Sequence, residues 1–310
     1  MHKHEIAISI VCPFFNEEDM VDLFMKEITA VCDELNKPFE IVCVNDGSTD
    51  NTLSKLLQAR ETYSNITIIN LSRNFGKEAA LTAGLDHAKG EAIIPIDADL
   101  QDPPELIKNF IPRWEEGYDV VLARRVDRSS DSIAKKITAR LFYKFHNKIS
   151  YTKIPDNVGD CRLITRKVLN AIQELPENQR FMKGIFAWVG FRTTVVEYRR
   201  DNRKAGKTSF YAWKLWNFAL DGITSFSTIP LRIWLYIGMV VSFLAFLYGG
   251  FIVLRTLIFG VDVPGYASLL TAILFLGGIQ LIGIGILGEY IGRIYMQSKR
   301  RPAYIVENEY

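Results

Sequence analysis

Residues 93–104 read Ile93-Ile94-Pro95-Ile96-Asp97-Ala98-Asp99-Leu100-Gln101-Asp102-Pro103-Pro104, an apolar run followed by two carboxylates and then two prolines. The apolar run predicts a strand, and the prolines end regular structure. In an extended segment alternate side chains point to the same face, so Asp97 and Asp99 are expected on one face. Two carboxylates there repel each other unless a cation lies between them, and oxygen ligands suit Mg²⁺ or Mn²⁺. The alternative is a solvated acidic turn that caps the following helix.

Strands and helices alternate through residues 1–125. Apolar runs predict strands at 6–12, 39–45, 67–71, 92–96 and 120–123, and helical spacing predicts helices at 17–35, 52–62 and 79–88. Short apolar strands separated by helices indicate an α/β fold with a parallel sheet covered on both faces. Ligands bind at the carboxyl ends of the strands in such sheets. The polar residues expected at that edge are Asn16, Glu17, Asp46, Arg73, Asn74, Asp97 and Asp99.

Several classes of protein are disfavoured by the composition. The 37 basic and 35 acidic residues give a net charge of +2, which implies no bulk affinity for nucleic acid. The chain has neither G-x-G-x-x-G after its first strand nor a P-loop motif. Its four cysteines show no C-x-x-C spacing and are expected to be buried, reduced thiols, and its four histidines form no zinc motif.

The C-terminal part contains two long apolar segments, 233–254 and 263–288, without a charged residue. Each exceeds the roughly 20 residues that cross a membrane. A short connection makes them a hairpin, with both chain ends on one side. The flanking basic residues predict that this side is cytoplasmic, and the N-terminus resembles no signal peptide. They are Arg232, Arg293, Lys299, Arg300 and Arg301, against Arg255 alone at the far end.

Two basic stretches, 124–140 and 199–214, lie between the predicted sheet and the hairpin. Such runs are commonly solvated faces. The second, however, leads into an amphipathic stretch, 210–229, whose aromatic residues suit a membrane surface. We therefore expect residues 199–230 to lie at the membrane and to present cations to an anionic lipid headgroup.

From Ser9 to Tyr304 the chain resembles glycosyltransferase family 2, and within it the bacterial polyprenyl-phosphate glycosyltransferases, above all bactoprenol glucosyltransferases of O-antigen modification. Each of the motifs that carry the resemblance is weak alone, and their order together with the hairpin is specific. They are Pro13-Phe14-Phe15-Asn16-Glu17-Glu18, Asn45-Asp46-Gly47-Ser48-Thr49-Asp50, Ser72-Arg73-Asn74-Phe75-Gly76-Lys77-Glu78, Asp97-Ala98-Asp99-Leu100-Gln101-Asp102-Pro103, Gly159-Asp160-Cys161-Arg162-Leu163 and Leu287-Gly288-Glu289-Tyr290-Ile291-Gly292-Arg293.

The resemblance implies a GT-A fold and a role for each matching residue. The implied nucleotide-sugar pocket comprises Pro13, Asn16, Glu17, Asp46, Arg73, Asn74, Lys77 and Asp97. The implied metal and diphosphate site comprises Asp97, Asp99 and Gln101. Asp99, Asp160, Arg203 and Lys207 are the implied catalytic residues, and the acceptor phosphate is expected to meet Arg124, Arg128, Lys135, Arg203 and Lys207. Cys161 stands where related enzymes often have an aromatic residue.

The implied reaction is an inverting transfer of a hexose, glucose from UDP-glucose, to undecaprenyl phosphate, with Mg²⁺ or Mn²⁺ offsetting charge on the leaving diphosphate. Asp160 is either a general base, a group that orients a basic side chain, or a structural carboxylate tied to Arg162 or a backbone amide. A separate flippase and a downstream transferase are expected, because two uncharged spans offer no polar path for a lipid headgroup. The resemblance also suggests a homo-oligomer such as a tetramer in the bacterial inner membrane.

The expected domains are a cytoplasmic GT-A catalytic domain (1–198), a juxtamembrane segment (199–230), two transmembrane helices (231–290, about 233–256 and 265–288) and a cytoplasmic tail (291–310). Other donors remain open: a UDP-4-amino-arabinose derivative, or GDP-mannose with a dolichol-like acceptor. A non-catalytic membrane scaffold is an alternative of a different class. A processive synthase is a third, which would need more spans and a Q-x-x-R-W-type motif.

Overall fold

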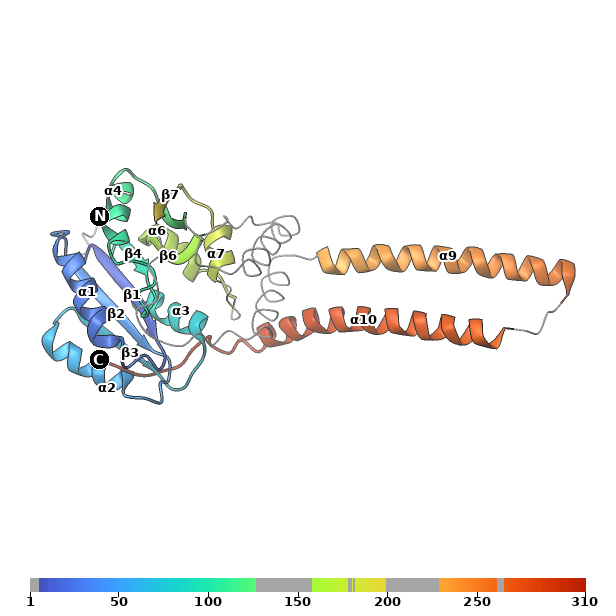
Figure 1. The fold of residues 1–310 in the computed structure, drawn as a ribbon, viewed down its shortest axis with the longest axis horizontal. Helices are drawn as coiled ribbons and strands as arrows, with labels where there is room; N and C mark the ends of the chain where they lie inside the picture. The colour runs from blue at the N-terminus through green and yellow to red at the C-terminus, as the bar shows by residue number, and fades with distance from the viewer. Residues whose placement is uncertain (1–5, 127–157, 178–179, 181, 199–228, 261–264) are drawn as a thin grey trace.

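The structure is a computed structural model that describes residues 6–126, 158–177, 180, 182–198, 229–260 and 265–310. An α/β domain is followed by two long helices, α9 (Ile229–Phe259) and α10 (Tyr266–Ser298), which extend away from it (Figure 1). The predicted fold class is confirmed.

Four parallel strands form the centre of the sheet, in the order β4-β1-β2-β3. They are β1 (Ile8–Phe14), β2 (Phe39–Asn45), β3 (Ile66–Leu71) and β4 (Ala92–Pro95), each close to its predicted range. Nearly every side chain on these strands is buried. Continuous apolar runs of this kind are typical of strands covered on both faces.

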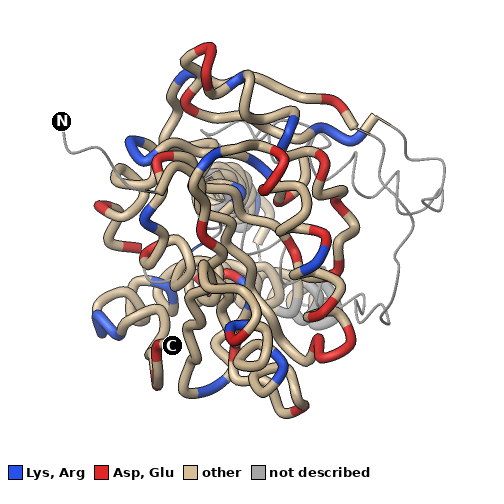
Figure 2. Tube along the Cα trace, turned by 90° about the vertical axis from the view of Figure 1, so that its left-hand side faces the viewer, with Lys and Arg blue, Asp and Glu red and all other residues tan. Residues whose placement is uncertain are grey.

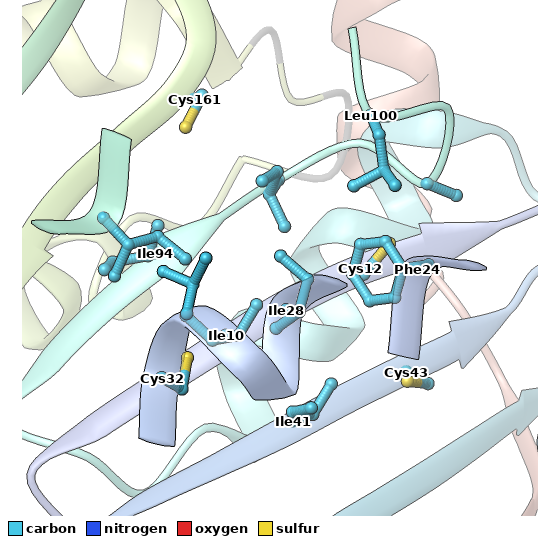
Figure 3. Close-up of a cluster of buried hydrophobic side chains, with 14 of the residues drawn as sticks. Ile10, Cys12, Phe24, Ile28, Cys32, Ile41, Cys43, Ile94, Leu100 and Cys161 are labelled. Atoms are coloured by element: carbon cyan, nitrogen blue, oxygen red, sulfur yellow. The ribbon is translucent and has the colours of Figure 1, made fainter. Parts of the chain in front are cut away.

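Helices cover both faces of this parallel centre. They are α1 (Val21–Asp33), α2 (Thr52–Thr62), α3 (Lys77–His87) and α4 (Leu106–Glu115). On one face Phe24 and Ile28 of α1 pack over Cys12 and Cys43 (Figure 3). On the other, α3 packs on Val11 and Val44. The first helix begins at Val21, later than predicted, because residues 15–20 form the loop after β1.

The four cysteines are free and buried, as predicted. Cys12, Cys43, Cys32 and Cys161 all belong to one hydrophobic cluster (Figure 3). Burial raises the pKa of each thiol, most strongly where the side chain is fully enclosed. They therefore act as small apolar core residues.

Four further strands complete an eight-stranded sheet among the described residues, in the order β7-β5-β6-β4-β1-β2-β3-β8. The fifth strand, β5 (Val120–Arg125), was predicted, whereas β6 (Val158–Thr165), β7 (Thr193–Tyr198) and β8 (Val306–Glu309) were not. Antiparallel pairing of β6 with β4 and β5 makes the sheet mixed. Two short helices, α6 (Arg166–Gln173) and α7 (Met182–Trp188), lie between β6 and β7.

The C-terminal residues return to the sheet of the α/β domain. Strand β8 pairs antiparallel with β3, and Tyr310 exchanges two backbone hydrogen bonds with Ile68. The Asn70 amide donates to Glu307 (2.8 Å), and Tyr304 donates its hydroxyl proton to Asp86 at the end of α3 (2.9 Å). Residues 306–309 are thus an edge strand of the domain, where the sequence suggested only a tail.

Helices α9 and α10 are long and apolar enough to cross a membrane. Both are longer than the predicted 233–256 and 265–288, because α9 runs from Ile229 to Phe259 and α10 continues to Ser298. Trp234 lies against Gly283, where an added Cβ would be 1.9 Å from the indole nitrogen. Most other described side chains of both helices are exposed and apolar, which suits contact with lipid.

Gly84→Ala tests how tightly α3 packs on the sheet. The new Cβ would lie 2.4 Å from Val11 Cγ1 and 3.1 Å from Val44 Cγ2. Overpacking costs about 1–3 kcal/mol, more than the roughly 1 kcal/mol of helix propensity that alanine adds. We expect a lower Tm in detergent. Gly285→Ala, where a Cβ meets nothing within 4 Å, is the control. A Tm raised by Gly84→Ala would contradict this packing.

Candidate active site

The loops after β1 and β2 are joined by hydrogen bonds. Asn16, in the left-handed region at φ 52°, accepts from the Thr49 backbone N–H (2.8 Å), and its own N–H donates to Ser48 Oγ (3.0 Å). The Glu17 N–H donates to Thr52 Oγ1 at the start of α2 (3.0 Å). Asn16 and Glu17 are therefore held at the predicted edge of the sheet. Pro13 lies half-buried in β1 beside them.

Asp46 holds the loop that precedes α3. The N–H groups of Phe75 and Gly76 donate to its two carboxylate oxygens, at 2.7 and 3.0 Å. Burial raises the pKa of this carboxyl, although the two backbone donors oppose the rise. The next residue, Gly47, is at φ 61°, and a Cβ there would lie 2.4 Å from the Arg73 backbone. Asp46 thus supports the loop that carries the predicted nucleotide residues Arg73 and Asn74.

The Arg73 guanidinium stacks on the Phe75 ring at 4.2 Å and donates to the Asn74 carbonyl (3.1 Å). Arg73 and Asn74 are both exposed at this edge of the sheet. The stacking restricts the arginine side chain while leaving it accessible to a ligand.

The two carboxylates of residues 97–99 lie in a turn, where the sequence predicted an extended segment. Strand β4 ends at Pro95, and the Leu100 N–H donates to the Asp97 carbonyl (3.3 Å). Leu100 is at φ 49° with its side chain buried in the core, which anchors the turn (Figure 3). Gln101 donates to both oxygens of Asp99, through its backbone N–H (3.2 Å) and its side-chain amide (2.7 Å).

Lys77, the first residue of α3, lies between two carboxylates. Its Nζ is 2.8 Å from an oxygen of Asp97 and 2.8 Å from Oδ2 of Asp160, which β6 supplies. Burial would lower the pKa of Lys77, but Asp97 and Asp160 together raise it. Burial also raises the pKa of Asp97, against the opposing charge of Lys77. The structure therefore brings Lys77, Asp97 and Asp160 together, although 83 residues separate the lysine from Asp160.

Lys183, on α7, is a member of this cluster that was not among the predicted site residues. Its Nζ lies 3.1 Å from Oδ1 of Asp160. Burial alone would raise the pKa of Asp160, but Lys183 and Lys77 hold it well below its usual value. No motif spacing links Lys183 to the D-x-D segment, so only the packing of α7 beside β6 identifies it.

The contacts of Cys161 and Arg162, which follow Asp160, differ from those that the sequence suggested. Arg162 donates to the backbone carbonyls of Gly159 (2.9 Å) and Asp160 (3.2 Å), and its guanidinium stacks on Phe186 at 4.3 Å. The Asp160 carboxylate instead contacts the two lysines. Cys161 faces the hydrophobic core, because successive side chains of a strand point to opposite faces. Its identity therefore does not shape a pocket directly.

The expected acceptor residues are mostly outside the described part of the chain, which omits Arg128, Lys135, Arg203 and Lys207. Arg124, at the end of β5, is described and forms an ion pair with Glu197 of β7. Acidic and basic residues are otherwise interspersed along the domain (Figure 2).

The donor set suits a cation that binds few protein ligands. Among the described residues no group of three or more His, Cys, Asp or Glu side chains could hold a metal ion. Asp97 and Asp99 are nevertheless close enough for Asp99 to raise the pKa of Asp97 further. Mg²⁺ in particular is usually bound through one or two carboxylates, with phosphates and water completing its shell. The two carboxylates fit that mode of binding, with Gln101 alongside.

Comparison with known proteins gives matches over almost the whole chain. Residues 9–173 match Glycosyl transferase family 2, and residues 229–294 match the GtrB C-terminal hairpin. The chain is 55% identical to the bactoprenol glucosyl transferase of Shigella phage SfV, over 98% of this chain and 99% of the relative. It is also 55% identical to the prophage bactoprenol glucosyl transferase homolog of Escherichia coli K12, over 97% and 99% of the two chains.

Among solved structures, the fold is similar to glucosyl-3-phosphoglycerate synthase from Mycobacterium tuberculosis, solved with Mn²⁺, UDP and glucosyl-3-phosphoglycerate. The TM-score is 0.50 at 19% identity, and the match covers 71% of this chain and 78% of the other. At that identity the similarity concerns the fold alone.

Asp46→Ala is expected to loosen the loop at residues 73–76. The substitution leaves two backbone N–H groups without an acceptor, and each costs about 1–3 kcal/mol of folding stability. Asp46→Asn keeps one acceptor oxygen and should cost less. Hydrogen exchange in this loop should therefore accelerate most in the alanine variant, with Tm falling in the same order. Asp22→Ala, at an exposed ion pair with Lys55, is the control. Unchanged exchange in Asp46→Ala would show that the carboxylate does not hold the loop.

Proposed function

The chain belongs to glycosyltransferase family 2, and we propose that it transfers a hexose from a nucleotide-sugar to undecaprenyl phosphate at a membrane surface. The observation that carries this proposal is the match to bactoprenol glucosyl transferases, which spans both the catalytic domain and the hairpin. Those relatives are named for glucosyl transfer, so we propose glucose, carried by UDP-glucose, as the transferred sugar. The product would be a lipid-phosphate-linked sugar for modification of O-antigen or another cell-envelope glycan.

The proposed donor site is the carboxyl edge of the parallel strands. The nucleotide-sugar would bind along the loops that carry Pro13, Asn16, Glu17, Asp46, Arg73, Asn74 and Lys77. Asp97, Asp99 and Gln101 would hold Mg²⁺ or Mn²⁺ beside the diphosphate. A divalent cation bound there would supply charge neutralisation for the leaving group. Lys77 lies within reach of the same place and adds a positive charge from the protein.

In the proposed reaction an oxygen of the acceptor phosphate attacks the anomeric carbon opposite the leaving group. The new carbon–oxygen bond forms as the bond to the nucleoside diphosphate breaks, and the diphosphate leaves with the electron pair. A phosphate monoester has a second pKa of about 6, so at neutral pH it attacks without losing a proton to the protein. Positioning of the phosphate by basic side chains then matters most. We propose Arg203 and Lys207, with Arg124, Arg128 and Lys135, for that role.

We propose that α9 and α10 cross the bacterial inner membrane as a hairpin with the catalytic domain and both termini in the cytoplasm. The pairing of β8 with β3 supports one part of this, because the chain must return to the side on which the sheet lies. Arg293, Lys299, Arg300 and Arg301 follow the second span and favour the cytoplasmic side. Transport of the product would need a separate flippase, and a downstream transferase would use it. A homo-oligomer such as a tetramer is part of the proposal.

Two alternatives stay within the reaction class: a UDP-4-amino-arabinose derivative as donor, or GDP-mannose with a dolichol-like acceptor. Selectivity for one hexose depends on pocket contacts worth only a few kcal/mol. A non-catalytic scaffold is disfavoured, because the chain belongs to a family of enzymes and has the carboxylates of Asp97 and Asp99.

Membranes containing the protein should convert undecaprenyl phosphate to a lipid-linked sugar when supplied with radiolabelled UDP-glucose, and EDTA should stop the reaction. A panel with UDP-galactose, UDP-4-amino-arabinose derivatives and GDP-mannose identifies the donor. Asp99→Asn should lower kcat at least 100-fold, because a charged oxygen at the diphosphate site is lost. Asp22→Asn is the matched surface control. Transfer from no donor would refute the function, and transfer in EDTA would refute only the metal role.

The proposed topology predicts which side of the membrane new cysteines face. The native cysteines are buried, so they should not react with an impermeant maleimide. In intact spheroplasts the reagent should label Asp262→Cys, between the spans, and should label Lys299→Cys only after permeabilisation. Labelling of Lys299→Cys in intact spheroplasts would place the C-terminal side outside and overturn the orientation.

A further inference from the structure

Asp160 is enclosed by ammonium groups on both of its carboxylate oxygens. Lys77 Nζ is 2.8 Å from Oδ2, and Lys183 Nζ is 3.1 Å from Oδ1. A carboxylate engaged in this way is poorly placed to accept a proton from a substrate. It is well placed to hold two lysines side by side.

A second contact sets the spacing of the two lysines. Glu78, next to Lys77, accepts from the backbone N–H of Met182, next to Lys183, at 3.1 Å. The Thr82 hydroxyl also lies against the Met182 sulfur (4.0 Å). The first turn of α3 is thus joined to the start of α7, so the two ammonium groups have a defined separation.

The cluster remains open to a ligand. The exposed fractions of the side chains are 47% for Lys77, 27% for Lys183 and 32% for Asp160. Lys77 contacts Asp97 and Asp160, Lys183 contacts Asp160, and the Glu78 carboxylate lies near both lysines. A divalent cation bound at Asp97 would release Lys77 from its role as the counter-ion of that carboxylate. The ligand that suits two adjacent ammonium groups is an anion with several oxygens spaced like those of a carboxylate, which is a phosphate group.

We propose that Lys183 is a phosphate-binding residue of this enzyme and that Asp160 is the positioning residue that pairs it with Lys77. The proposal rests on the proposed function, because the phosphate is either that of the polyprenyl acceptor or the diphosphate of the nucleotide-sugar. It assigns a role to Lys183, for which the sequence predicted none. It also assigns Asp160 to orientation of cations, in place of proton removal.

The test compares Lys183→Met with Lys183→Arg and with Lys167→Met as control. Lys167, on α6, forms an ion pair with Asp119 at 3.8 Å and lies over the Phe191 ring, and it belongs to no part of the proposed site. A hydrogen bond to a charged group contributes about 1.5–3 kcal/mol, which corresponds to about 10- to 150-fold in affinity. Lys183→Met should therefore raise KM for one phosphate substrate by that factor, and Lys183→Arg should restore part of it.

Two measurements identify the phosphate. Calorimetric titration with UDP and Mn²⁺ reports on the diphosphate, and KM for undecaprenyl phosphate in detergent reports on the acceptor. Weaker UDP binding in Lys183→Met assigns Lys183 to the donor, whereas normal UDP binding with a raised acceptor KM assigns it to the acceptor. Either result supports the proposal. Normal values for both, with a lower Tm alone, would show an ordinary structural ion pair and overturn it.

A double-mutant cycle tests the role of Asp160. If Asp160 acts through Lys183, Asp160→Asn should raise the same KM, and the double variant should lose less than the product of the two single effects. If Asp160→Asn instead lowers kcat alone, and the double variant shows the product of the two single effects, Asp160 is a general base and the positioning role is refuted. If the wild-type protein transfers sugar and Lys183→Met is unaffected, only the phosphate-binding role of Lys183 is refuted. If the wild-type protein neither transfers sugar nor binds UDP, the proposed function is refuted together with that role.

Discussion

Repulsion among three carboxylates is the physical constraint around which the site is arranged. Asp97 and Asp99 follow β4, and Asp160 lies on β6, the antiparallel neighbour of β4. Lys77 bridges Asp97 and Asp160, while Gln101 donates to both oxygens of Asp99. Without these cations and donors, the desolvated negative charges would destabilise the edge of the sheet. The same repulsion is what the proposed divalent cation would offset.

The lysines depend on contacts made by their neighbours in sequence. Asp46 accepts from Phe75 and Gly76, which sets the start of α3 and hence Lys77. Glu78 accepts from Met182, which sets α7 beside α3 and hence Lys183. The loop after β2, the start of α3 and the start of α7 are therefore coupled through backbone N–H groups and the carboxylates of Asp46 and Glu78. Removing one of these carboxylates would leave backbone donors without an acceptor, which destabilises the segment that carries them.

The residues that follow α10 contact the catalytic domain. After α10 the chain contributes Tyr304 to a hydrogen bond with Asp86 and β8 to the sheet edge. Asn45 donates to Asn70, which donates to Glu307, so polar contacts run from the central strand β2 to the C-terminal strand. These contacts restrict how the domain can be oriented relative to α9 and α10. A restricted orientation would suit an enzyme whose proposed acceptor is held in a membrane.

The sequence by itself determined the parallel strands, the helices between them, the apolar hairpin and the residues at the carboxyl ends of the strands, because these follow from local hydrophobic pattern and motif order. It missed β6, β7 and β8, whose partners in the sheet lie far away in the chain: β6 and β8 pair antiparallel with β4, β5 and β3, and β7 pairs parallel with β5. The extended geometry expected at residues 97–99 was wrong, because burial of Leu100 imposes a turn. Only the tertiary structure decided that Lys77 and Lys183 share Asp160. Charges from α3, α7 and β6 meet there through packing, and no spacing along the chain encodes that meeting.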